Sequence, residues 1–127
     1  HPHEPLRNYL GQAYLGSGNT DAAERHFRQA LALSRNNAST PRALDSLLGM
    51  AGVYARRGLQ QRALDLIEMI LAHRACEQST RQRAQALRRD LLASDSAAGL
   101  THAAPAAPLD AVIAAVLTAA EPASTAT

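Results

Sequence analysis

Apolar residues recur every three to four positions along most of the chain, and short polar breaks interrupt this pattern at regular distances. Such spacing predicts α-helices with one buried face and not strands, whose side chains alternate at every second residue. Gly18 and Gly58 fall in two of the breaks, and glycine is common just after a helix ends. The pattern therefore predicts two antiparallel helical hairpins, over about residues 4–34 and 40–74, joined by a polar stretch that ends before Pro41.

Each predicted helix has a stripe of apolar residues and a residue suited to cap its start. Thr20 or Asp21 is expected to cap the second helix, and Ser39 or Thr40 the third. In the first hairpin the expected buried residues are Leu6, Leu10, Ala13 and Tyr14, followed by Ala23, Phe27, Ala30, Leu31 and Leu33. In the second hairpin they are Leu44, Leu47, Leu48, Met50, Ala51 and Tyr54, followed by Ala63, Leu64, Ile67, Ile70 and Leu71.

The two hairpins are copies of one unit. When the sequence is shifted so that Leu10 falls on Met50, small residues align with small ones and large apolar residues with large ones. The aligned pairs are Leu10 and Met50, Gly11 and Ala51, Tyr14 and Tyr54, Gly18 and Gly58, Ala23 and Ala63, Phe27 and Ile67, and Leu31 and Leu71. Self-similarity at a fixed period is typical of repeat proteins, in which each unit completes its core by stacking on its neighbours.

The remainder of the chain predicts further helix and a change of composition. A helix over about residues 79–93 extends the repeats, so that the repeat domain covers residues 1–93. Residues 94–107 are rich in Ala, Ser and Pro and are expected to form a linker, followed by a short helix over residues 108–121 and a disordered tail over residues 122–127. The apolar residues that favour docking of this last helix on the repeats are Leu109, Ile113 and Val116.

The pattern of each hairpin resembles the tetratricopeptide repeat. That family places Leu-Gly and Tyr in its first helix, Gly at the bend, and Ala, a large apolar residue and Ala in its second. These places are held by Leu10, Gly11, Tyr14, Gly18, Ala23, Phe27 and Ala30, and then by Met50, Ala51, Tyr54, Gly58, Ala63, Ile67 and Ile70. The period of 40 exceeds the family's 34, and the family's proline after the second helix is absent. The resemblance implies an all-α fold in which antiparallel hairpins stack as a short right-handed superhelix.

The resemblance also implies a function. In this family the first helices of the hairpins line a concave groove that binds a protein or peptide, so the chain is expected to be a non-catalytic interaction module. The groove would then present Asn8, Tyr9, Gln12, Leu15, Asp45, Leu48, Gly52 and Arg56. The family's chaperone-tail clamps use a lysine in a set that this chain does not match, because it has no lysine.

A larger parent protein is a further expectation. Repeats of this length resemble the C-terminal sensor or scaffold region of large bacterial regulators, in which an ATPase or DNA-binding portion comes first. Because the chain begins with His1 and not with Met, we expect it to be a fragment of such a signalling protein. Partners would then be another protein, other domains of the parent chain, or a second copy, since two and a half units lie near the lower limit for a stable array.

Charge adds one alternative. All 13 basic residues are arginine, 11 acidic residues are interspersed among them, and the formal net charge is +2. A nucleic-acid site usually needs a concentrated basic face. The pairs Arg56-Arg57 and Arg88-Arg89 make the second half more basic and leave a nucleic-acid-binding helical domain as the alternative function.

Catalytic and metal chemistry find little support in the sequence. No His-x-x-x-His pair or paired cysteines exist, and Pro2 lacks the backbone N–H that a His1-Pro2-His3 copper site would need. Cys76 is expected to be a half-buried structural cysteine, and His26 and His73 to be surface or capping residues. No cofactor, metal or catalytic residue is predicted. A single cysteine favours a cytoplasmic protein, and no segment predicts contact with a membrane.

Overall fold

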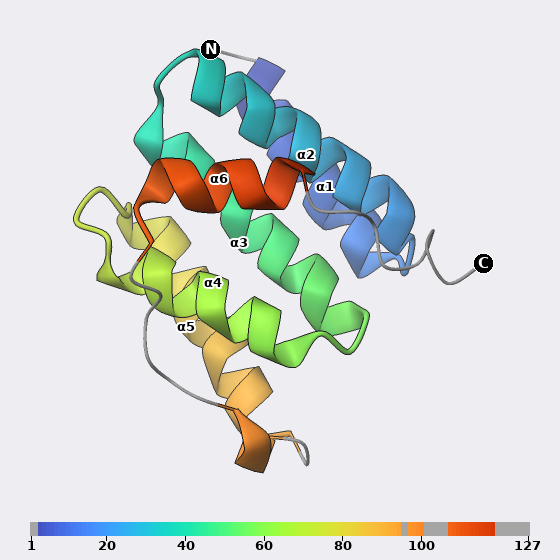
Figure 1. Ribbon diagram of the computed structural model, residues 1–127. Coiled ribbons are helices and arrows are strands. Elements are labelled where there is room, and N and C mark those ends of the chain that lie inside the picture. Colours follow the sequence, from blue (N-terminus) through green and yellow to red (C-terminus); the bar gives the residue numbers. More distant parts are fainter. Residues whose placement is uncertain (1–2, 95–96, 101–106, 119–127) are drawn as a thin grey trace.

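The computed structural model describes residues 3–94, 97–100 and 107–118, with side chains from Leu10 onward. Within these residues the chain forms six α-helices and one 3-10 turn and contains no strand (Figure 1). The elements are α1 (His3–Gly16), α2 (Thr20–Asn36), α3 (Thr40–Arg56), α4 (Gln60–Ala72), α5 (Gln78–Leu92), η1 (Ala97–Gly99) and α6 (Leu109–Thr118). The predicted tail at residues 122–127 and most of the predicted linker lie outside the described residues.

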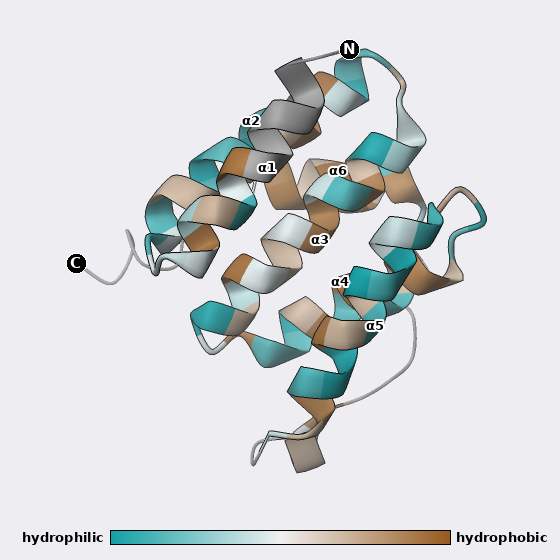
Figure 2. Ribbon diagram, turned by 180° about the vertical axis from the view of Figure 1, so that it is seen from behind, coloured by the Kyte–Doolittle hydropathy of each residue, from teal (hydrophilic) through white to brown (hydrophobic). Residues whose placement is uncertain are grey.

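The helices stack as two hairpins and a half, and this confirms the predicted all-α hairpin fold. Each of the first four helices packs on the next one, and α3 also packs on α1 and α5. On one face of the molecule α3 therefore lies between α1 and α5 (Figure 2). The opposite face carries α2 and α4, and α6 lies across it (Figure 1). None of the described helices is both long enough and apolar enough to cross a membrane.

Three turns with the same backbone geometry set the period of the repeat. Gly18, Ala38 and Gly58 are evenly spaced along the sequence, and their φ angles of 90°, 55° and 79° all lie in the left-handed region. After each of them a backbone N–H donates to a carbonyl on the preceding helix, as Asn19 to Tyr14 (2.9 Å), Ser39 to Ser34 (2.9 Å) and Leu59 to Tyr54 (2.8 Å). One helix and its turn thus span half of the repeat period, and a hairpin spans the whole of it.

Replacing Ala38 with glycine is expected to stabilise the protein by about 0.5–1 kcal/mol. The left-handed conformation brings the Cβ of an L-residue close to the following carbonyl, and glycine has no Cβ. Urea unfolding followed by circular dichroism measures the change. Gly18→Ala, at the equivalent turn, is the matched control and is expected to destabilise by about 1 kcal/mol. An unchanged unfolding midpoint in both variants would contradict this account of the turns.

Small residues allow α1, α2 and α3 to approach one another closely. Phe27 of α2 is fully buried, and a Cβ placed on Gly11 of α1 or Gly49 of α3 would lie closer than 3.0 Å to its ring. Contact this close leaves no room for a methyl group. The glycines therefore form a slot for the Phe27 ring between the first hairpin and the second.

Two predicted details of the first hairpin are wrong. Ala13 and Tyr14 were assigned to the buried face of α1, but both are exposed, Tyr14 to 37%, whereas the equivalent Tyr54 is only 4% exposed. The reason is position, because α1 ends the described stack, whereas α3 packs between other helices and α6 lies near the Tyr54 ring. Thr20 and Asp21 are not the cap of α2. The cap is Asn19, whose side-chain oxygen accepts a hydrogen bond from the backbone N–H of Ala22 at 3.2 Å.

Candidate functional site

A cavity of about 180 Å³ opens between α1, α3 and α5. Gly52 of α3 lets the Leu15 side chain of α1 pack closely against α3 at this cavity, because a Cβ there would come within 2.8 Å of that side chain. The lining residues are Gln12, Leu15, Phe27, Leu48, Gly49, Gly52, Arg83 and Leu87. Three helices that are far apart in the sequence thus build one hollow on the face seen in Figure 2.

The floor of this cavity is apolar and its edge is polar. Phe27 and Leu48 are buried beneath it, and Leu15 and Leu87 are half-buried at its sides. Gln12 is exposed at the edge, where its amide has both a donor and an acceptor to offer. Such a surface suits a bound apolar side chain whose own backbone lies along the polar edge.

Arg83 reaches this edge from α5 and forms an ion pair with Asp45 of α3. Both side chains are partly exposed, so solvent screens the pair and its contribution to stability is small. Its structural consequence matters more. The pair connects α3 with α5 and sets the position of the guanidinium beside the cavity.

The structure brings together half of the groove residues expected from the sequence. Gln12, Leu15, Leu48 and Gly52 all line the cavity. Asp45 lies next to it through its ion pair, whereas Arg56 is exposed at the last turn of α3 and does not line it. The side chains of the two remaining candidates, Asn8 and Tyr9, lie outside the described ones.

Four residues of the cavity were missed. Arg83 and Leu87 lie on α5, and continuing the repeat into this helix would have identified Leu87, which stands almost one full period after Leu48. Gly49 lies next to Leu48 but was not assigned to the groove face. Phe27 belongs to a second helix of a hairpin and reaches the groove only through the slot left by the glycines.

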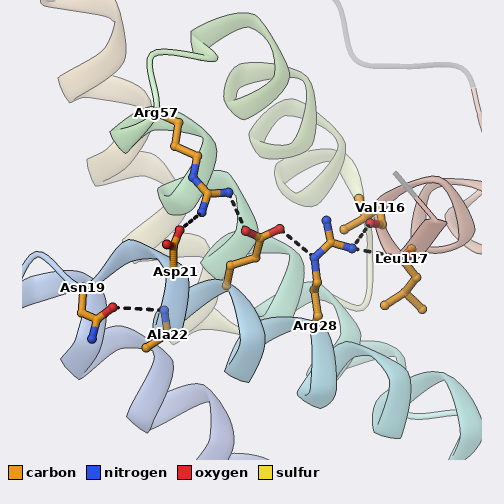
Figure 3. A network of polar contacts seen from close by, with 8 residues as sticks. Asn19, Asp21, Ala22, Arg28, Arg57, Val116 and Leu117 are labelled. Carbon is orange, nitrogen blue, oxygen red and sulfur yellow. Dashed lines mark hydrogen bonds and ion pairs between the residues drawn. The ribbon is translucent and has the colours of Figure 1, made fainter. Parts of the chain in front are cut away.

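A buried carboxylate holds two arginines on the opposite face (Figure 3). Glu24 of α2 is 1% exposed, and its two oxygens accept from Arg28 Nε at 2.8 Å and from an amino group of Arg57 at 2.5 Å. Arg57 also pairs with Asp21 at 2.6 Å. Burial by itself would lower the pKa of Arg57, but hydrogen bonds and charge interactions with Glu24 and Asp21 outweigh burial and raise this pKa. The network joins the end of α3 to α2.

The other chemically versatile side chains have structural positions. The ring of His26 stacks on that of Tyr14, with centroids 5.3 Å apart. His73 is the C-cap residue of α4, as expected for a capping histidine. Cys76 is half-buried, and burial raises the pKa of its thiol, which disfavours the reactive thiolate. Among the described residues no three His, Cys, Asp or Glu side chains group as metal ligands, and His1 and Pro2 lie outside them.

Several arginines of the second half bind within the chain. Arg57, Arg83 and Arg88 each pair with a carboxylate, Arg88 with Glu68 at 3.2 Å. Arg81 donates to the backbone carbonyl of Leu71 at 2.9 Å. Pairing of this kind reduces the positive field available to a phosphate backbone. The structure therefore gives no specific support to the nucleic-acid alternative.

Comparison with known proteins gives one finding. A family model described as tetratricopeptide repeat matches residues 4–75, which run from the start of α1 to beyond the end of α4. No curated protein and no solved structure matches the chain.

Proposed function

Because the chain belongs to the tetratricopeptide repeat family, we propose that it is a non-catalytic interaction module that binds a segment of a partner protein in the groove between α1, α3 and α5. Repeats of this family generally mediate protein–protein interactions. The observation that carries the proposal is the cavity lined by Leu15, Leu48 and Leu87, with Gln12 and Arg83 at its edge. An extended or helical partner segment would place one apolar side chain on the Phe27 floor.

Preorganisation of the groove supports this function. Its floor is part of the core, since Phe27 and Leu48 are buried, and the missing side chains of Gly49 and Gly52 let Phe27 and Leu15 pack closely against α3. A site that is already shaped loses little side-chain entropy when a ligand binds. Affinity would come mainly from the apolar insertion, and orientation from hydrogen bonds along the edge.

The proposal extends to the setting of the module. We propose that it acts in the cytoplasm as the C-terminal sensor or scaffold portion of a larger bacterial regulator. The support is the resemblance of its long repeat units to the repeats of such proteins and the small number of units, because short arrays gain stability from neighbouring structure.

Site-specific photo-crosslinking tests the groove. A benzophenone amino acid at Gln12, which is exposed and lines the cavity, is expected to capture a partner protein in source cells. The control position is Arg25, which is exposed on α2 and does not line the cavity. The same product from both positions, or a product from Arg25 alone, would contradict binding in the groove.

Calorimetry then measures the affinity of the captured partner for the unmodified chain and for two variants of it. Leu87→Asp places a charge in the groove, and we expect it to weaken binding by about tenfold or more, since the apolar contact is lost and a carboxylate must be desolvated. Leu33→Asp changes a leucine that is half-buried on α2, outside the groove, and should leave affinity unchanged. Equal weakening by both variants would point to a general loss of structure.

A further inference from the structure

The face opposite the groove already holds a helix. α6 packs on α2 and lies beside α4 (Figure 1), and its Ile113 and Val116 are 3% and 6% exposed. The start of α6 lies beside the turn between α2 and α3, where Leu109 and Ile113 line a small cavity together with Ala43. Further along α6, Val112 and Val116 face Tyr54. The repeats thus provide an apolar seat for a helix of about three turns.

Arg28 recognises the end of this helix. One of its guanidinium nitrogens donates to the backbone carbonyl of Val116 at 2.7 Å and to that of Leu117 at 3.3 Å (Figure 3). The last carbonyls of a helix lack partners within the helix and carry its partial negative charge, so a cation stabilises them. On the α6 side these contacts involve only backbone atoms. Any helix that ended at the same point could make them.

The seat is preorganised independently of α6. Glu24 holds Arg28 through its Nε, and Glu24 is itself buried and held by Arg57. All three residues belong to the repeats. The guanidinium therefore stays directed at the seat when α6 is absent.

The resident helix fills its seat incompletely. A cavity of about 350 Å³ remains between α6 and α4, over Tyr54 and Leu66. On the α6 side its wall includes Ala111 and Ala115, whose methyl groups are too short to fill it. Arg62 lies over the Tyr54 ring at 5.9 Å and forms part of the wall with Asp65. Larger apolar side chains at these two positions of a helix would occupy this cavity and bury their own apolar surface in it.

We propose that the face formed by α2 and α4 is a second binding site, which accepts an amphipathic helix of a partner protein in exchange for α6. The partner helix carries a stripe like that of Leu109, Ile113 and Val116, has large apolar residues in place of Ala111 and Ala115, and ends at Arg28. This site is distinct from the groove between α1, α3 and α5 and does not depend on the function proposed for it.

Exchange requires little change in the repeats. α6 has 10 residues, and helices this short are marginal in isolation, so α6 gains its order from the seat. It follows α5 only after residues 93–108, so it can leave while all the turns between the repeat helices stay intact. A tethered helix competes at an effective concentration of roughly millimolar, so a partner must bind better than α6 does.

Peptide binding to the full chain tests the proposal. The probes are a fluorescent peptide of residues 107–118 with blocked ends and the same peptide carrying Ala111→Leu and Ala115→Leu. We expect the leucine peptide to bind at least about tenfold tighter than the parent peptide, because it fills the cavity over Tyr54. Ile113→Asp in the protein removes the resident helix from its seat and should strengthen binding of both peptides by about tenfold or more. Adding Arg28→Gln to that protein should weaken both by about fivefold.

The controls separate the possible occupants. Ala115→Leu in the protein lets α6 fill its own cavity and should weaken binding of the leucine peptide without loss of structure. Absence of peptide binding to the Ile113→Asp protein, with helicity retained by circular dichroism, would overturn the proposal, as would equal affinity for that protein and the unmodified one. A doubled mass by light scattering that Ile113→Asp abolishes would assign the seat to α6 of a second copy and also overturn it.

Discussion

Replacing Glu24 with alanine is expected to lower the free energy of unfolding by about 3–5 kcal/mol, because it leaves buried positive charge without its counter-ion. The Glu24 carboxylate neutralises Arg28 and Arg57, whose side chains are only 16% and 13% exposed. A guanidinium group keeps its charge at any pH at which proteins are stable, so loss of a proton cannot relieve the cost of burying it. Urea unfolding followed by circular dichroism measures the loss, and the change in midpoint converts to free energy through the slope of the transition.

Asp21→Ala is the matched control for this prediction. Asp21 pairs with the same Arg57, but its side chain is 77% exposed, so its removal should cost only about 0–1 kcal/mol. Glu24→Gln keeps the shape of the side chain but only one acceptor oxygen, so it can accept from one arginine and not from both, and its loss should fall between the two. Similar losses for Glu24→Ala and Asp21→Ala would show that burial of the carboxylate does not determine its contribution.

The sequence predicts the fold class because the information for it is local. The spacing of apolar residues and the matching glycines at Gly18 and Gly58 indicate helical hairpins, and the structure confirms them. The equivalent turn at Ala38 escapes such reasoning, since alanine seldom adopts a positive φ. Its geometry follows from the packing of the two hairpins against each other.

Positions that are equivalent in the repeat differ where their surroundings differ. Tyr14 and Tyr54 occupy the same place in successive units, yet only Tyr54 lies on a helix that packs between others and close to α6. A repeat pattern predicts which face of a helix is apolar. It does not predict how much of that face is covered, because coverage depends on neighbours in space.

The groove and the seat of α6 likewise depend on neighbours in space that a repeat pattern does not predict. The candidate groove could be predicted in part, since Gln12, Leu15, Leu48 and Gly52 follow from the face of two successive first helices. The Arg83–Asp45 pair joins residues 38 positions apart, and no local pattern signals it. The seat of α6 could not be predicted from the sequence either. Glu24 and Arg28 have the i, i+4 spacing of an ordinary surface pair, and nothing in that spacing indicates that the carboxylate is buried or that Arg57 also pairs with it.

Phe27→Ala is expected to destabilise the protein by about 3–5 kcal/mol, since truncation of a fully buried aromatic ring leaves a cavity that its surroundings only partly close. The ring lies between Gly11 and Gly49, neither of which has a side chain that could move into the space. Chemical unfolding measures the loss. A change below about 1 kcal/mol would contradict the slot, because a loss so small requires that the helices collapse onto each other.

A double-mutant cycle with Gly49 tests the slot directly. Gly49→Ala alone adds a methyl group that collides with the Phe27 ring and should cost about 1–3 kcal/mol. In the Phe27→Ala background the same methyl group enters empty space and alanine favours the helix over glycine, so the change should be neutral or stabilising. The two substitutions are therefore expected to couple by about 1–3 kcal/mol, and strictly additive losses would mean that Gly49 is small for a reason other than Phe27.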